Sequence, residues 1–231
     1  MRFPALKELF SRIGAFVPRS VIHYLNGGLN YLHVGRWMHE RGFQIPARVS
    51  GREEFYRAVF PHLSEPLDYL EFGVFDGKSM QQWSRLLTHA QSTLQGFDSF
   101  EGLPETWGIV CTKETFDVGG NIPVIDDTRV RFFKGWFNET LPPFLESFQP
   151  GGMLVVHLDA DLFSSTSFVL GQLKPLLKPG TVLLFDEFFD REHETKAFAE
   201  FLDETGVQAK CLAATRALTQ VAFRLESAPR A

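Results

Sequence analysis

Short apolar runs that alternate with amphipathic stretches constrain the fold of this chain more than any other feature. Five such runs, most of them ending in Gly, Asp or Glu, lie at 68–75, 92–98, 129–135, 151–161 and 180–188. Helical patterns separate most of them, at 78–90, 166–179 and 193–206. Because strands that alternate with helices form right-handed βαβ units, this pattern predicts an α/β fold with a mostly parallel, doubly wound sheet.

Two further apolar runs close the chain, at 209–217 and 219–227. They are too close together for a parallel crossover but can pair as an antiparallel hairpin. We therefore expect five parallel strands followed by a terminal hairpin, with the last strand antiparallel.

The first 65 residues have a different pattern, which predicts helices at 36–43 and 51–63. We expect an N-terminal helical extension (1–65), making lid or oligomer contacts, before the sheet domain (66–231). Apolar residues at three- and four-residue spacing between Phe3 and Phe16 predict a further amphipathic helix that ends before Pro18. We expect this helix to pack on the domain or on a second subunit. The alternative is a position on a membrane surface.

Composition excludes several classes of protein. A chain of 231 residues with 44% hydrophobic and 22% charged residues can bury a stable core without a disulfide or a structural metal. A net charge of −5 argues against nucleic acid as a partner. Cys111 and Cys211 stand alone, which favours neither a disulfide framework nor a zinc site. With no apolar run long enough for a transmembrane segment and no signal-peptide core, we expect a cytoplasmic protein.

The first apolar run leads into a glycine turn, Glu71-Phe72-Gly73-Val74-Phe75-Asp76-Gly77-Lys78-Ser79. Glycines four apart let the backbone bend tightly, and Ser79 with the first helical N–H groups can receive a carboxylate or phosphate. A turn that binds nothing is the alternative. The turn is not the GxGxxG dinucleotide fingerprint.

Asp98 ends the second predicted strand, where an acidic residue can accept hydrogen bonds from both ribose hydroxyls of an adenosine. A turn or capping aspartate is the alternative. Together with the glycine turn, Asp98 favours a nucleoside ligand.

Acidic residues also follow the fourth and fifth strands, in His157-Leu158-Asp159-Ala160-Asp161 and Asp186-Glu187. Ligands bind beyond the carboxyl ends of such strands, and clustered oxygen donors suit Mg²⁺, Mn²⁺ or Ca²⁺. Asp161 has a second interpretation as the cap of the helix entered through Ser164. His157 is a candidate metal-site partner or base, and equally a core histidine.

The segment 99–129 is too long for a plain connection, and we predict a lid that contains Trp107 and Phe116. A loop that only packs on the sheet is the alternative. Trp136 and Phe137 are candidates to flank an adenine, or else belong to the core.

Five motifs together resemble one family. YLEFGVFDGKS, GFDSFEGLPETW, GWFNETLP, HLDADLFSST and LLFDEF follow one another as in the macrocin-type (TylF/MycF-like) O-methyltransferases, over about residues 67–224. The resemblance implies the class I S-adenosylmethionine-dependent, Rossmann-like methyltransferase fold with an antiparallel last strand. It also implies a hydroxyl acceptor on a sugar or a similar small natural product.

The resemblance assigns roles to individual residues, which we state as expectations. The cofactor residues that the resemblance implies are Glu71, Gly73, Gly77 and Asp98, and we add Phe72, Ser79 and Ser99 from the same two turns to the expected set. The ligands of Mg²⁺ or another divalent cation are Asp159, Asp186 and Glu187, although relatives more often have Asp or Asn at the last position. From the chemistry of methyl transfer and not from the resemblance, we expect Asp159 to be catalytic, with either Asp161 or His157 as the base.

Two rival functions remain at this stage. A nicotinamide-dependent oxidoreductase would share the sheet and the ribose acid, but it normally has the GxGxxG turn. A non-catalytic nucleoside-binding relative would be indicated by loss of the strand-tip carboxylates, which are present here. The expected partners are a small-molecule acceptor and a second copy of the chain bound through the N-terminal helices.

Overall fold

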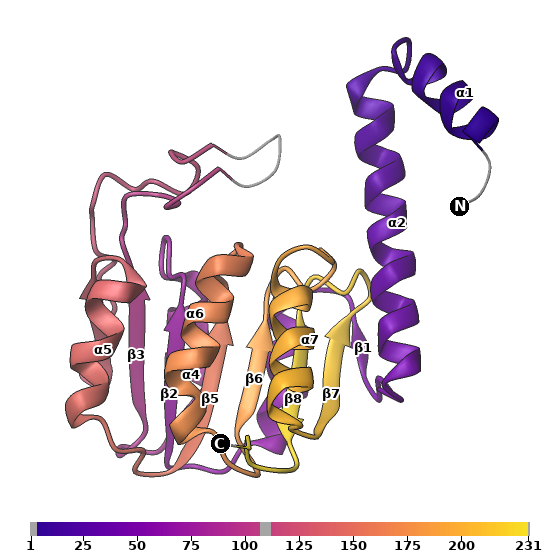
Figure 1. Cartoon of the computed structure of the whole chain (residues 1–231). Helices are drawn as coiled ribbons and strands as arrows, with labels where there is room; N and C mark the ends of the chain where they lie inside the picture. Colours follow the sequence, from indigo (N-terminus) through magenta and orange to yellow (C-terminus); the bar gives the residue numbers. More distant parts are fainter. Residues whose placement is uncertain (1–3, 107–111, 231) are drawn as a thin grey trace.

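The computed structural model describes residues 4–106 and 112–230, and its centre is an eight-stranded sheet of order β1-β7-β8-β6-β5-β2-β3-β4 (Figure 1). Neighbouring strands among β2 to β6 pair in parallel. The strand β8 lies between β6 and β7 and is antiparallel to both, which confirms the predicted sheet. The bounds are β2 (Leu67–Phe72), β3 (Thr93–Asp98), β4 (Val130–Lys134), β5 (Met153–Leu158), β6 (Val182–Phe185), β7 (Ala209–Thr215) and β8 (Val221–Leu225).

The sheet has one strand that the sequence pattern did not predict. Strand β1 (Arg48–Val49) pairs in parallel with β7 at the edge of the sheet, in a region expected to be helical. Two residues are too few to show the alternation by which a strand is recognised.

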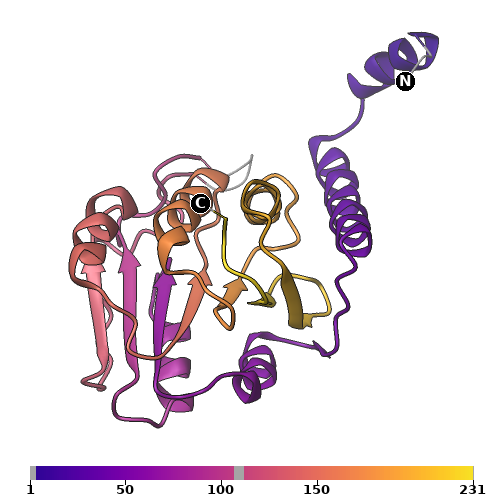
Figure 2. The same ribbon diagram turned by 60° about the horizontal axis from the view of Figure 1, so that its bottom comes forward.

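Helices cover both faces of the sheet (Figures 1 and 2). Helices α5 (Phe137–Ser147), α6 (Phe163–Leu173) and α7 (Glu194–Thr205) lie on one face, and α3 (Arg52–Val59) and α4 (Lys78–Leu86) on the other. Short 3₁₀ turns follow α3 and α6, at Phe60–His62 and Lys174–Leu176. The sequence pattern did not predict α5, because its two internal prolines cannot donate helical hydrogen bonds.

Aromatic side chains form much of the core. Phe72 and Phe97 stack between the sheet and α5, while Tyr56, Tyr69 and Trp83 pack together on the opposite face. Each fully buried aromatic of this size contributes roughly 1.5–3 kcal/mol relative to an exposed one. The two packed faces fix the strand ends, on which the site is built.

The N-terminal helices α1 (Pro4–Gly14) and α2 (Arg19–Glu40) extend away from the sheet (Figures 1 and 2). The C-terminal part of α2 joins the core through Val34 and Met38, so the extension is continuous with the sheet domain from there. Helix α1 has no buried residue, and Phe16 just beyond it is 89% exposed. Of the two packings expected for α1, the structure does not show the one on its own domain, and the one on a second subunit stays a prediction. None of the described helices is long and apolar enough to cross a membrane.

Arg129 joins the end of α4 to the start of β4. Its guanidinium donates to the carbonyl oxygens of Ser84, Leu87 and His89, at 2.7, 2.8 and 3.2 Å, and to the carboxylate of Asp127. These carbonyls lie at a helix end, where they lack helical partners. The hydrogen bonds from Arg129 lower the pKa of Asp127 to about 2.

We expect Asp127→Asn to lower the free energy of unfolding by about 1 kcal/mol at pH 7, because the pair lies near the surface and water screens part of it. The folded pKa lies below the unfolded value of 3.8, so this stabilisation is present above pH 3.8. It is lost as the pH falls through 2. Urea unfolding of both proteins between pH 7 and pH 2 tests this. A difference that stays constant down to pH 2 would contradict it.

Candidate active site

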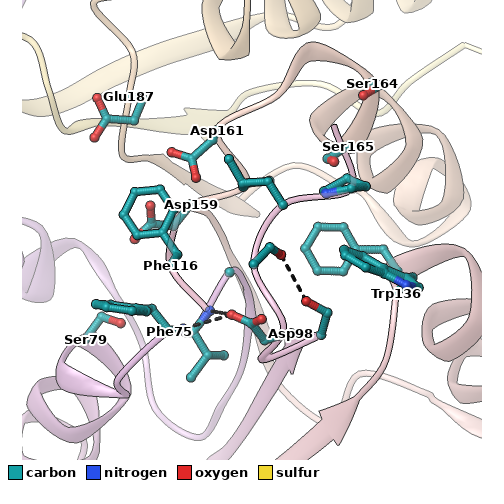
Figure 3. Close-up of a pocket in the computed structure, with 18 of the residues that line it drawn as sticks. Phe75, Ser79, Asp98, Phe116, Trp136, Asp159, Asp161, Ser164, Ser165 and Glu187 are labelled. Carbon is teal, nitrogen blue, oxygen red and sulfur yellow. Dashed lines mark hydrogen bonds between the residues drawn. The ribbon is translucent and has the colours of Figure 1, made fainter. Parts of the chain in front are cut away.

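A cavity of about 350 Å³ opens at the carboxyl ends of the central strands β2, β3 and β5 (Figure 3). This is the edge at which open α/β sheets bind their ligands. One part of its wall is apolar and the other carries carboxylates. The apolar lining consists of Val74, Phe75, Leu103, Pro104, Phe116, Trp136, Phe137 and Phe168, and the acidic lining of Asp76, Asp98, Asp159, Asp161 and Glu187.

The glycine turn brings two strand ends together. Gly73 has a φ of +95°, and a Cβ built on it would lie 1.8 Å from the carbonyl oxygen of Asp159. Gly77 has a φ of +78°, and its Cβ would lie 2.9 Å from the ring of Pro123. A side chain at either position is therefore excluded by neighbouring protein atoms. These glycines serve close packing of the chain around the cavity, as well as the tight turn that the sequence predicted.

Asp98 organises the turn from the tip of β3. Its carboxylate accepts hydrogen bonds from the N–H groups of Val74, Phe75 and Phe100, at 2.7, 2.8 and 2.6 Å. Phe75 and Phe100 have positive φ values of 52° and 57°, which bulky residues rarely adopt without such support. A carboxylate offers about four acceptor positions, so about one is left for a ribose hydroxyl rather than the two expected.

The other expected cofactor residues divide into two groups. Ser79 and Ser99 are buried beside or along the cavity, but their hydroxyls already donate to Glu71 and to the carbonyl of Gly102, at 2.5 and 3.0 Å. Glu71 and Phe72 are fully buried and do not line the cavity. Neither residue is therefore placed for the direct ligand contact that the sequence predicted. Phe72 packs on Phe97, and Glu71 has internal partners.

A buried chain of polar side chains runs beneath the cavity. The Glu71 carboxylate accepts from Tyr69 Oη at 2.5 Å, and Tyr69 Oη lies 2.7 Å from His157 Nδ1. On its other side His157 Nε2 is 3.5 Å from Asp186 Oδ1. The chain thus connects Ser79, at the start of α4, with Asp186 at the end of β6.

His157 is therefore not a base for a ligand in the cavity, which corrects one of the expected catalytic roles. It is fully buried and does not line the cavity. Burial lowers the pKa of His157, but the carboxylates of Asp186 and Glu71 outweigh it and raise the pKa to about 9. A histidine that holds its proton at neutral pH acts as a counter-ion for Asp186.

Asp159, which lines the cavity, and Asp186, which is fully buried and does not line it, lie close together. Their carboxylate oxygens and a His157 nitrogen lie within 4.8 Å of one another, a spacing that can hold a metal ion. Burial, and then the charge of Asp186, raise the pKa of Asp159 well above its usual value. Asp186 Oδ1 is buried without a hydrogen-bond partner among the described residues. Hard oxygen donors with surplus negative charge fit Mg²⁺ or a similar cation.

Asp161 and Glu187 lie at the same end of the cavity (Figure 3). Burial, and then the charge of Asp186, raise the pKa of Asp161 to about 7 and that of Glu187 to about 8. Glu187 does not belong to the close group of donor atoms formed by His157, Asp159 and Asp186. The expected third metal ligand thus lines the cavity without completing the cluster in this arrangement.

Asp161 does not cap α6, which removes the alternative interpretation of this residue. The N-cap of α6 is Leu162, and it has no side-chain capping bond. Asp161 itself has a φ of +58°, an unfavourable conformation for a residue with a Cβ. Strain of this kind concentrates at functional sites, and here it accompanies a carboxyl group that lines the cavity.

Two residues of the site were not predicted from the sequence. The guanidinium of Arg52, from α3, contacts Asp186 and lies 3.8 Å from Asp159 Oδ2. Glu194, at the start of α7, is fully buried and accepts from the N–H groups of Ala160, Asp186 and Glu187. Glu194 resembles any acidic residue in a first helical turn, and Arg52 is far from the cluster in sequence, so neither carried a local signal.

Glu194 ties together the two loops that bear the carboxylates. We expect Glu194→Gln to lower the free energy of unfolding by about 2 kcal/mol, since the amide nitrogen cannot accept from the backbone N–H groups it would face. Glu200→Gln is the matched control, because Glu200 lies on the same helix and its side chain is 49% exposed. Urea unfolding measures both, and equal unfolding free energies for the two variants would contradict the assigned role.

Phe116, in the predicted lid, lines the cavity and packs edge-to-face on Phe75, with ring centroids 5.5 Å apart. Trp136 and Phe137 also line the cavity, and Phe137 packs on Phe72 as well, so it belongs to both the cavity and the core. Trp107 and Cys111 lie outside the described residues.

Comparison with protein families gives a match over most of the chain. The sequence model of the macrocin-O-methyltransferase (TylF) family matches residues 62–221. The 8-demethyl-8-(2,3-dimethoxy-alpha-L-rhamnosyl)-tetracenomycin-C 4'-O-methyltransferase of Streptomyces olivaceus is 31% identical, over 53% of this chain and 53% of that protein. The chain thus spans about half the length of this relative.

Solved structures share the fold. The calicheamicin methyltransferase CalS11 has a TM-score of 0.56 at 18% identity, over 97% of this chain and 94% of its own. The O-methyltransferase NovP has a TM-score of 0.58 at 22% identity, over 75% of this chain and 77% of its own. The Rossmann-like methyltransferase fold is thereby confirmed. Since the family match extends over most of the chain, from just before β2 into β8, the protein belongs to the macrocin-O-methyltransferase (TylF) family.

Proposed function

We propose that this protein is an S-adenosylmethionine-dependent O-methyltransferase that uses Mg²⁺ to methylate a hydroxyl group of a sugar or similar natural product. The observation that carries the proposal is a single cavity with Asp98 and an apolar wall on one side and the Asp159–Asp161–Glu187 group on the other. Family membership and the sugar-directed activity in the name of the Streptomyces relative support the choice of acceptor.

The cofactor fits the part of the cavity near Asp98. The remaining acceptor position of Asp98 would bind one ribose hydroxyl, and Trp136 and Phe137 offer apolar surfaces for the adenine. The methionine portion would then lie along the turn from Gly73 to Ser79, facing the acidic wall. A volume of about 350 Å³ is at the lower end of the range for such ligands.

Methyl transfer needs an oxygen nucleophile held in line with the sulfonium methyl group. The new bond joins that oxygen to the methyl carbon, the sulfur–carbon bond breaks, and the hydroxyl proton leaves. Asp161 is the proposed acceptor of that proton. It lines the cavity at the same end as Asp159, and a carboxylate within reach of the acceptor hydroxyl group can take its proton.

Asp159 and Asp186 would hold Mg²⁺, with Glu187 as the third carboxylate. When bound, the cation would orient the acceptor and lower the pKa of its hydroxyl group. His157, which lies beneath the cavity, keeps Asp186 ionised. Burial raises the pKa of Asp186, but the nearby imidazole of His157 and its charge help to lower it overall. Removal of divalent cations with EDTA is expected to abolish methyl transfer, and Mg²⁺ is expected to restore it.

A thermal-shift comparison of two ligands separates this function from the oxidoreductase alternative. S-adenosylhomocysteine at 100 times its Kd stabilises the folded protein by about 2.7 kcal/mol and raises Tm, whereas NAD is expected to leave Tm unchanged. A larger shift with NAD would overturn the proposed activity. A non-catalytic relative would bind S-adenosylhomocysteine but transfer no methyl group to any member of a glycoside library.

The N-terminal helices are proposed to pair with a second copy of the chain. Helices α1 and α2 and the turn between them expose apolar side chains. These include Leu9, Phe10, Ile13, Phe16, Tyr24, Leu25 and Leu32. Light scattering after gel filtration is expected to give the dimer mass for the full chain and the monomer mass for Phe10→Glu/Leu25→Glu. A monomeric wild type would contradict the pairing. The expected cytoplasmic location stays a prediction.

A further inference from the structure

Arg52 places a permanent positive charge between the two carboxylates that are proposed to hold the cation. Its Nη2 atom contacts Asp186 Oδ2 and lies 3.8 Å from Asp159 Oδ2. The guanidinium is thus at the oxygens that a divalent cation would need. An arginine remains charged at any pH at which the protein is folded.

The position of Arg52 in α3 is not explained by the stability of the helix. Arg52 is the first residue of α3, directly after the N-cap Gly51. Cations at this end oppose the helix dipole, whereas Glu53 and Glu54 in the same turn favour it. Among the described residues, the two aspartates are the ion-pair partners of Arg52. Its charge is therefore explained by the acidic cluster.

Arg52 also has a path out of the cluster. Its side chain is 40% exposed and lines the cavity, whereas the side chain of Asp186 is fully buried. The guanidinium can therefore rotate toward solvent without unfolding α3, while Glu194 holds the backbone of Asp186 and His157 lies against its carboxylate. A cation and Arg52 cannot share the same oxygens, because their charges repel.

We propose that Arg52 is the resident counter-ion of Asp159 and Asp186 in the metal-free protein and that a divalent cation binds by displacing it. This inference rests on the metal site of the proposed function. Arg52 is then a positioning residue that neutralises Asp159 and Asp186 while no cation is bound. Because the cation must displace it, Arg52 weakens metal affinity.

The experiment is a Mn²⁺ titration of the full-length, metal-free protein, with free Mn²⁺ measured by electron paramagnetic resonance. Arg52→Gln is expected to bind Mn²⁺ at least about tenfold more tightly than the wild type, since no charge-assisted hydrogen bond must be broken first. Its Tm without metal should be lower and should rise more on adding Mn²⁺. Arg57→Gln is the matched control on the same helix, since Arg57 pairs with exposed Glu53 and does not line the cavity.

A second measurement uses the wild type alone and so does not depend on a variant that folds. Phenylglyoxal labels accessible arginines, and mass spectrometry gives the rate at Arg52. Saturating Mn²⁺ is expected to raise that rate severalfold while the rate at Arg57 stays constant.

Two outcomes overturn the inference while leaving the metal site intact. One is Mn²⁺ binding by Arg52→Gln that is equal to or weaker than that of the wild type. The other is bound Mn²⁺ with no increase in labelling of Arg52. If neither the wild type nor the variant binds Mn²⁺, the metal in the proposed function fails together with the exchange.

Discussion

Replacing Asp159 by Asn is expected to lower kcat/KM for methyl transfer by about 10³-fold or more while the protein stays folded. Asp159 lines the cavity, and burial, and then the charge of Asp186, raise its pKa. Asparagine keeps the shape of the side chain but removes one of the two central anionic donors. Loss of about 4 kcal/mol of transition-state stabilisation from the cation corresponds to about 10³ in rate.

The measurement is the initial rate of transfer of a labelled methyl group to an acceptor found by screening glycosylated natural products. Asp126→Asn is the matched control, because Asp126 is exposed and does not line the cavity. Affinity for S-adenosylhomocysteine should change little in Asp159→Asn, since the nucleoside is proposed to lie at the other end of the cavity. A rate within tenfold of the wild type would show that Asp159 does not hold a catalytic cation.

The second large effect is expected at Asp98. Asp98→Asn should raise the Kd for S-adenosylhomocysteine by about 10²-fold or more, measured by calorimetry. The asparagine side chain has only one acceptor oxygen, and its NH₂ group must face backbone N–H groups that the carboxylate now satisfies. The turn at Phe75 and Phe100 loses its support, and the ribose loses a charged acceptor.

The control for this prediction is again Asp126→Asn, and circular dichroism establishes that both variants are folded. Mn²⁺ affinity should remain within a few-fold of the wild-type value in Asp98→Asn, because Asp98 does not belong to the close group of donor atoms from His157, Asp159 and Asp186. A Kd for S-adenosylhomocysteine within threefold of the wild-type value would show that Asp98 supports the turn but does not bind the ribose.

The sheet was predictable because its signals are local. Each parallel strand is a short apolar run, and the close spacing of the last two runs required a hairpin. The elements that were missed lack such signals. Strand β1 is two residues long, and α5 contains Pro142 and Pro143, which are typical of a break.

Some of the residues that form the site were predictable from the sequence. Asp98, Asp159, Asp161 and Glu187 follow strands and line the cavity, as strand-tip residues of a parallel sheet do. The sequence could not tell that Glu71 and His157 face each other below the cavity, because this depends on the register of β2 against β5. Arg52 and Glu194 reach the cluster from other helices, so only tertiary structure reveals them.

The buried polar chain from Ser79 to Asp186 has a thermodynamic consequence. One end lies at the turn proposed for the cofactor and the other at the carboxylates proposed for the cation. Two ligands that each shift the protons or rotamers of such a chain are energetically coupled, and the coupling is reciprocal. If bound Mg²⁺ changes the affinity for the cofactor by some factor, bound cofactor changes the affinity for Mg²⁺ by the same factor. The stability of the full complex is therefore the same whichever ligand binds first.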